Sequence, residues 1–222
     1  THAQIKCLRP SDIKKTKTQI VICNTYHLWE QVLKTNKLMA SGSGNFVLDQ
    51  LRIKLPTMTD SGGFQIFSLG FGKEGKVGKI LNPVDNRLRK SIIHRRKNIR
   101  ITKNGAYFKW NGETKFLGPE LSVQIQKKLG ADIIFAFDEC TSPLDGFDYN
   151  KKALERTHRW ALKCLESKFK IQDSRFQQFL FGIVQGGRYK SLRIKSAKFI
   201  GSLPFDGFGI GGSFSKEDMM GA

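Results

Sequence analysis

The chain has 222 residues, of which 39% are hydrophobic and 17 are phenylalanine, so it can bury a core and is not expected to be disordered. Lys and Arg number 38 against 19 Asp and Glu, a formal net charge of +19, which favours a polyanionic partner, with nucleic acid ahead of a membrane surface. The alternative is that a lysine-rich composition follows the source genome and says little about partners.

The cysteines suggest neither a disulfide framework nor a zinc site. Cys7, Cys23, Cys140 and Cys164 are widely spaced and form no CxxC pair, which fits reduced cytosolic thiols. The longest apolar run, Ile133 to Phe137, is far too short to span a membrane, and no secretory signal is visible. The first residue is Thr1 rather than Met, which suggests an incomplete or processed start.

The N-terminal part predicts a helix and then a strand. Residues 10–19 favour a short helix with Ser11 or Asp12 near its N-cap. Residues 20–23, Ile-Val-Ile-Cys, predict a buried strand, and residues 24–27, Asn-Thr-Tyr-His, form its polar tip. Residues 42–44, Gly-Ser-Gly, predict a loop that leads to the next strand.

Residues 57–69, Thr-Met-Thr-Asp-Ser-Gly-Gly-Phe-Gln-Ile-Phe-Ser-Leu, place a carboxylate at the end of a short strand. Asp60 is followed by Ser61, Gly62 and Gly63, and the two glycines let the backbone approach a flat ligand and supply N–H donors. The competing interpretation is a tight turn in which Asp60 caps the next segment, since Asp-Ser-Gly-Gly is common turn chemistry.

Residues 70–118 predict an antiparallel β insertion with a cationic face. Glycines at 70, 72, 75 and 78 precede a basic stretch between 87 and 103, and Asn111-Gly112 predicts a type I′ hairpin turn. Such a charge run is often only a solvated face. Tyr107, Phe108 and Trp110 would also suit a surface that faces RNA.

The second half alternates helices with apolar strands. Helices are predicted from Pro119 to a stop at Gly130, over 150–168 and over 190–200, and strands over 132–138, 179–184 and 205–210. This alternation predicts a parallel sheet of the α/β class. One candidate fold is a (β/α)₈ TIM-like barrel over 1–222, incomplete because about five strands can be traced and closure needs eight. A doubly wound open sheet is the alternative, although no phosphate-binding glycine fingerprint follows the first strand.

The strand ends carry the candidate site. Asp60, Asp138, Gln185 and Gly211-Gly212 each follow a predicted strand, and the C-terminal strand ends of a barrel converge on one mouth. Two carboxylates, an amide and glycine N–H groups suit the edge of a purine-like base, and Phe64 could cover the ring. Taken singly, Gln185 could be a satisfied strand-end amide and Asp138 a helix cap.

Four motifs in order, TDSGGFQIFSL, FDECT, FGIVQGG and GFGIGG, resemble the tRNA-guanine transglycosylases (queuine tRNA-ribosyltransferases) of the bacterial type. ICNTYHL at 22–28 resembles the segment after that family's second barrel strand, so the chain is expected to contain about strands two to six. The resemblance implies exchange of the wobble guanine of GUN-anticodon tRNAs for a 7-deazaguanine, preQ1 or queuine. The exchange is a double displacement through a covalent intermediate, without ATP.

The resemblance also assigns roles by motif. Asp60 would be the acid/base residue, and Ser61, Gly62, Gly63 and Phe64 would line the base site, with Phe64 stacked on the ring. Asp138 would hold the N–H edge of the base, Gln185 its carbonyl side, and Gly212 would donate a backbone N–H. Cys140 is expected to pack the pocket wall rather than to react.

The family's nucleophilic Asp and its zinc ligands, Cys-x-Cys-x-x-Cys with a later His, are expected beyond Ala222, so zinc has no ligands in this chain. A homodimer in the cytoplasm and contact of Arg95-Arg96-Lys97 with tRNA are further expectations. Ser215 stands where many bacterial members have a branched apolar residue, which predicts room for queuine as well as preQ1. The alternatives are a non-catalytic tRNA-binding partner subunit and a generic basic RNA-binding module.

Overall fold

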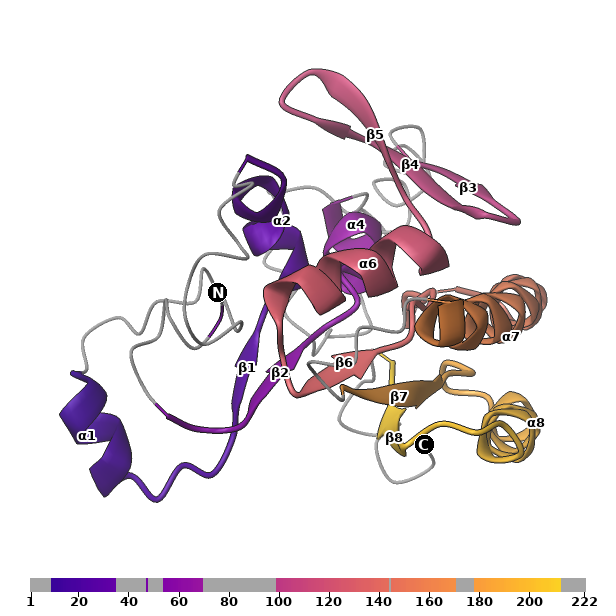
Figure 1. The fold of residues 1–222 in the computed structure, drawn as a ribbon. Coiled ribbons are helices and arrows are strands. Elements are labelled where there is room, and N and C mark those ends of the chain that lie inside the picture. The colour runs from indigo at the N-terminus through magenta and orange to yellow at the C-terminus, as the bar shows by residue number, and fades with distance from the viewer. Residues whose placement is uncertain are drawn as a thin grey trace.

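The computed structural model describes residues 9–34, 47, 54–69, 99–143, 145–170 and 178–212. Its centre is a parallel sheet of five strands in the spatial order β1-β2-β6-β7-β8 (Figure 1). The strands are β1 (Val21–Cys23), β2 (Thr57–Thr59), β6 (Ile133–Phe135), β7 (Phe179–Val184) and β8 (Gly207–Ile210). In register, Met58 of β2 lies opposite Ile22 on one side and Ile133 on the other, so β2 and β6 are neighbours although a long segment separates them in the chain.

The strand order distinguishes between the two predicted sheets. Along the sheet the described strands follow one another in chain order, without the reversal that marks a doubly wound fold. Since parallel crossovers are almost always right-handed, an order without reversal places the crossover helices on one face, as in a barrel wall. The α/β class and the five traced parallel strands are thus confirmed, and the doubly wound alternative is not favoured.

Helices connect the strands and cover the sheet. They are α1 (Pro10–Lys15), α2 (Thr25–Lys34), α4 (Gly63–Leu69), α6 (Pro119–Leu129), α7 (Phe147–Lys170) and α8 (Lys190–Gly201). In Figure 1, α6, α7 and α8 follow one another around the sheet, with α7 between the other two. The hydrophobic core lies between them and the strands, with Phe137 and Trp160 fully buried at its centre. Within the described ranges, no helix is long and apolar enough to cross a bilayer.

A second, antiparallel sheet lies between α4 and α6 in the chain. It consists of β3 (Ile99–Thr102), β4 (Gly105–Trp110) and β5 (Glu113–Leu117), and it lies above α6 in Figure 1. Its inner face joins the core through an aromatic cluster, in which the rings of Tyr26 and Trp29 on α2 lie 4.0 and 5.6 Å from Trp110. Such ring pairs add about 0.5–1.5 kcal/mol each beyond their buried area.

Several local predictions are confirmed. α6 begins at Pro119 and ends at Gly130, whose φ of 73° is the left-handed conformation that stops a helix. Asn111 and Gly112 both have positive φ, 50° and 83°, as a type I′ turn requires. β7 spans residues 179–184 as predicted, while β6 ends at Phe135, three residues before Asp138.

Other local predictions are wrong. Helix α1 ends at Lys15 rather than at residue 19. Its N-cap is Arg9 rather than Ser11 or Asp12, and the backbone N–H of Arg9 donates to the carboxylate of Asp12, the third residue of the helix, as in a capping box. The polar residues after β1, predicted only as the polar tip of the strand, begin helix α2. Ile22 is 56% exposed, so β1 is not buried on both faces, because it is the edge of the described sheet. The loop at 42–44, the glycines from 70 to 78 and the basic residues 87–97 lie outside the described residues.

Candidate active site at the strand ends

The predicted site residues lie at one edge of the parallel sheet. Asp60 follows β2 directly, Asp138 comes three residues after β6, Gln185 follows β7, and Gly211 and Gly212 follow β8. Because all of these strands run in the same direction, their C-terminal ends lie on the same side. This edge carries two aspartates, an amide and a pair of glycines.

The Asp60 carboxylate accepts hydrogen bonds at both oxygens. Oδ2 accepts from Asn24 Nδ2 at 2.6 Å and from Gln65 Nε2 at 3.3 Å, while Oδ1 accepts from the backbone N–H of Thr25 at 2.9 Å and of Gly62 at 3.2 Å. These donors lie at the start of α2 and at the start of α4. The N-termini of two helices therefore fix the position of the Asp60 carboxylate. Hydrogen bonds to the charged form favour ionisation and work against burial.

Asp138 and Gln185 form a second polar unit beside Asp60. Gln185 Nε2 donates to Asp138 Oδ2 at 2.6 Å, and Ser61 Oγ donates to Asp138 Oδ1 at 3.3 Å. The backbone N–H of Gln185 donates to Ser196 Oγ at 3.1 Å, which fixes the strand end against α8. Gln185 Oε1 is buried and has no hydrogen-bond partner among the described residues. An unpaired buried acceptor costs about 1–3 kcal/mol, so this atom is available to a ligand donor.

Burial raises the pKa values of both aspartates. It is the main cause for Asp138, whose pKa rises to about 6, although the hydrogen bonds from Gln185 and Ser61 lower it and the charge of Asp60 raises it further. The pKa of Asp60 is also raised by burial, against the donors from Thr25, Gly62 and Gln65. The charge of Asp60 therefore lies close enough to raise the pKa of Asp138, and both carboxylates can hold or release protons nearer neutrality than a free aspartate.

The turn after Asp60 is closely packed against the strand end of β6. A Cβ added to Gly63 would lie 2.8 Å from the carbonyl oxygen of Asp138, so only glycine fits there. Ser122 Oγ donates to the Ser61 carbonyl at 2.7 Å and ties the turn to α6. Phe64, the next residue, is 37% exposed in spite of its apolar ring. A closely packed turn is thus followed directly by an accessible aromatic ring, four residues after Asp60.

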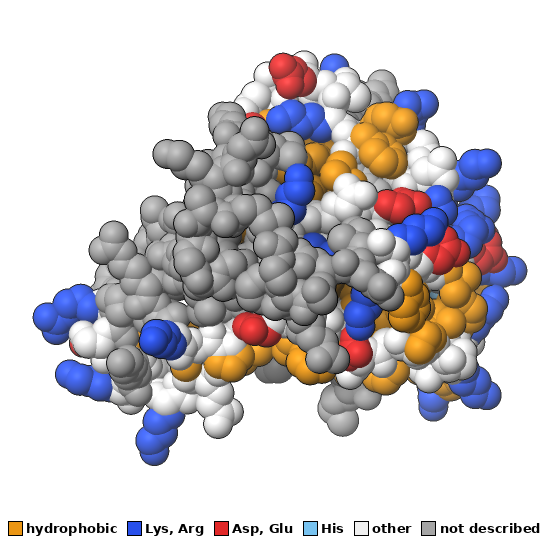
Figure 2. All heavy atoms as spheres, viewed as in Figure 1, with side chains coloured by type: hydrophobic (Ala, Val, Ile, Leu, Met, Phe, Trp, Pro, Cys, Tyr) orange, Lys and Arg blue, Asp and Glu red, His pale blue; other side chains and the backbone are white. Residues whose placement is uncertain are grey.

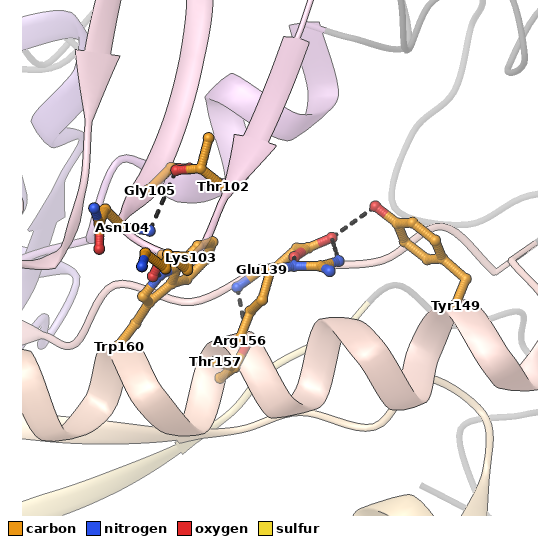
Figure 3. Close-up of polar contacts among 9 residues, drawn as sticks. All are labelled: Thr102, Lys103, Asn104, Gly105, Glu139, Tyr149, Arg156, Thr157 and Trp160. Atoms are coloured by element: carbon orange, nitrogen blue, oxygen red, sulfur yellow. Dashed lines mark hydrogen bonds and ion pairs between the residues drawn. The ribbon is translucent and has the colours of Figure 1, made fainter.

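Glu139, the residue after Asp138, forms a buried ion pair. Arg156 of α7 donates Nε to Oε2 at 2.6 Å and Nη2 to Oε1 at 2.9 Å, and Tyr149 donates its hydroxyl to Oε1 at 2.7 Å. The backbone N–H of Glu139 donates to Thr157 Oγ1 at 3.1 Å. Figure 3 shows this cluster between the strand-end loop and α7. The bidentate contact fixes the backbone that carries Asp138.

Sequence reasoning missed the residues that support the site. Asn24 and Thr25 were expected only as a polar tip, yet their position directly after a strand was a signal that they could reach a neighbouring strand end. Arg156, the partner of Glu139, had no such signal in the sequence, because it lies within the helix α7 and not next to a strand end. Cys140 is partly buried, and its thiol donates to the Thr141 carbonyl at 3.9 Å. Ser215 and the residues around it lie outside the described part.

The described residues contain no group of three or more His, Cys, Asp and Glu side chains arranged to hold a metal ion. Asp60 and Asp138 each accept hydrogen bonds from neutral donors. This environment suits carboxylates that accept N–H groups rather than carboxylates that bind zinc. The zinc implied by the resemblance therefore does not fit these residues.

Comparison with known proteins gives a consistent result. The family model described as queuine tRNA-ribosyltransferase matches residues 1–221. A protein of Archaeoglobus fulgidus named "Putative queuine tRNA-ribosyltransferase" is 45% identical over 99% of this chain and 55% of its own length. A queuine tRNA-ribosyltransferase of Staphylococcus aureus is 40% identical over 96% of this chain and 48% of its own length. The chain thus spans about half the length of these curated relatives.

Proposed function

The chain belongs to the queuine tRNA-ribosyltransferase family, and on that premise we propose that it carries the base-binding half of a tRNA-guanine transglycosylase. The reaction replaces the wobble guanine of a GUN-anticodon tRNA with a 7-deazaguanine, preQ1 or queuine. A carboxylate attacks the ribose C1′, the bond from C1′ to the guanine nitrogen breaks, and the incoming base then displaces the enzyme. The attacking carboxylate is expected outside the described residues, as are the zinc ligands.

The observation that carries this proposal is the Asp138–Gln185 unit. With a pKa of about 6, Asp138 is ionised in roughly nine molecules out of ten at pH 7, so it accepts from the N–H and NH₂ groups of a guanine-like base. Gln185 Nε2 uses one of its two N–H groups on Asp138, which leaves the other for the base carbonyl. The unpaired Oε1 of Gln185 offers a further acceptor in the same place.

The other site residues complete a base-sized pocket in this proposal. Phe64 stacks on the purine ring through its exposed face, and Gly212 donates its backbone N–H to the base. Asp60 transfers the proton to the departing guanine and takes one from the entering base, a role that its raised pKa suits. Gly62 and Gly63 line the base site with their backbone, while their N–H groups hold Asp60 Oδ1 and Ser61 Oγ in place.

The wider expectations follow from the same premise. The sheet order without reversal supports a (β/α)₈ barrel, of which the described strands form one arc. The single partial barrel domain of residues 1–222 and the basic insertion of 70–118 remain part of the proposal. So do tRNA and a free 7-deazaguanine as partners, a homodimer, a zinc ion held elsewhere, and a cytoplasmic location.

Guanine exchange tests the proposal. The purified protein is incubated with a GUN-anticodon tRNA and radiolabelled guanine, and the label that enters the RNA is counted. Incorporation is expected where the protein assayed includes the attacking carboxylate, and Asp60→Ala should then abolish it because the leaving base lacks its proton donor. Binding of free guanine is expected in either case. Asp148→Ala, which removes an exposed aspartate at the start of α7, should leave incorporation unchanged. If the unaltered protein neither incorporates label nor binds free guanine, the proposed function is wrong.

A further inference from the structure

An open cleft lies between the antiparallel sheet and the helices α6 and α7. Its volume is about 520 Å³, within the range of roughly 300–1,000 Å³ typical of ligand sites. Arg100, Lys103, Tyr107 and Phe116 line it from the sheet, and Glu120 and Lys163 line it from α6 and α7. None of these residues belongs to the site at the strand ends.

The walls of the cleft are tied together. The turn between β3 and β4 rests on α7, where Trp160 Nε1 donates to the Lys103 carbonyl at 2.9 Å, as Figure 3 shows. Lys163 Nζ donates to Asn104 Oδ1 at 3.3 Å in the same turn. Trp160 is fully buried, so the turn is anchored to the core. Since the walls are already held in place, a ligand would not have to order them on binding.

The cleft has unneutralised positive charge. Lys163 pairs with Glu120 at 3.2 Å, so the single acidic residue of the lining is already matched. Within the described residues, no carboxylate pairs with Arg100 or Lys103, and both side chains are exposed. The guanidinium carbon of Arg100 lies 4.3 Å from the Tyr107 ring centre, a stacking that fixes the plane of its N–H donors. Lys and Arg side chains also gather on the right of Figure 2, over the region of β3, β4 and α7.

The cleft and the candidate active site share the first turn of α6. Glu120 of that turn lines the cleft, and Ser122, two residues later, donates to the Ser61 carbonyl in the base site. A polyanion that reaches both the cleft and the strand-end site would therefore have to pass around the N-terminus of α6. A single extended ligand is consistent with this arrangement, since the phosphates of a nucleic acid repeat along its length.

We infer that this cleft is a phosphodiester site that binds the backbone of the tRNA whose wobble base enters the strand-end site, an inference that rests on the proposed function. The planar fork of Arg100 suits two oxygens of one phosphate, and Lys103 supplies a second charge. Thr102 and Asn104 line the same turn with polar groups. Backbone contacts position an RNA without reading its sequence, so the cleft would set the orientation of the anticodon stem and leave base choice to the other site.

The test compares two double variants that each remove two positive charges. Arg100→Gln/Lys103→Gln changes the cleft, and Lys128→Gln/Lys198→Gln changes exposed lysines in the last turns of α6 and α8. Binding of a labelled GUN-anticodon stem-loop and of an unrelated hairpin is followed by fluorescence anisotropy between 50 and 200 mM salt. Thermal melts check that both variants fold.

The cleft variant should bind both RNAs about 3- to 10-fold more weakly, and the slope of log affinity against log salt should fall by roughly one to two. The control variant should lose less affinity on both RNAs. Free guanine should bind all forms equally. Equal losses in the two variants, or an unchanged slope in the cleft variant, would overturn the inference. A protein that neither exchanges nor binds guanine but shows the cleft effect would retain the phosphate site and lose the proposed function.

Discussion

Asp138 is expected to bind the base, and its buried charge is expected to lower the stability of the fold. The substitution Asp138→Asn tests both effects. The folded pKa of about 6 lies above the reference value of 3.8, so the folded state keeps a proton that the unfolded state has already lost. Stability therefore decreases as pH rises from about 4 to 6 and stays low above that range. An asparagine never ionises, so it removes this penalty while Gln185 Nε2 can still donate to its side-chain oxygen.

The size of the effect follows from the pKa difference. Two units correspond to about 3 kcal/mol at pH 7 and, by the same linkage, to about 1 kcal/mol at pH 4.5. For a chain of this length each kcal/mol raises the melting temperature by roughly 2–4 °C, so Asp138→Asn should melt several degrees higher at pH 7. Its affinity for free guanine should fall about 10- to 100-fold, because the amide lacks the charged acceptor.

Differential scanning calorimetry at pH 4.5 and 7 tests the stability term, and isothermal titration with guanine tests the binding term. Asp148→Asn, in the first turn of α7, controls for the exchange of a carboxylate for an amide at an exposed position. The reasoning is refuted if the gain in melting temperature is the same at both pH values. A loss of stability at pH 7 would also refute it, because burial would then not be the main influence on this carboxylate.

Two further substitutions test the supporting contacts. Arg156→Met should lower the free energy of unfolding by about 3 kcal/mol in urea titrations, since it leaves the Glu139 carboxylate, 1% exposed, without its cation. The control is Arg159→Met, exposed on the same helix, which should change the free energy of unfolding by less than about 0.5 kcal/mol. Similar losses in the two variants would contradict the argument. Asn24→Ala removes the 2.6 Å donor to Asp60 and should move the acid limb of the guanine-exchange profile to higher pH, because the ionised form loses a partner. If the acid limb of the pH profile does not move, the ionisation of Asp60 does not determine its position.

Local chemistry explains why much of the fold could be predicted. The ends of α6 at Pro119 and Gly130 and the turn at Asn111-Gly112 follow from backbone geometry that those residues adopt almost wherever they occur. β7 was predictable because a short apolar run between turn residues has few other structures open to it. The helix after β1 was not predicted, because the polar residues that follow the strand were interpreted only as its polar tip, although such side chains also cap and support a helix start.

The sequence by itself determined the α/β alternation and the residue types at each strand end, because both depend on patterns within a few residues. Only the tertiary structure decided that β2 lies beside β6 and that Gln185 bonds Asp138, since these contacts join segments far apart in the chain. The same holds for the Arg156–Glu139 pair and for the cleft beside Trp160. Such contacts depend on how the elements pack, and no local pattern specifies which distant partner a buried charge will find.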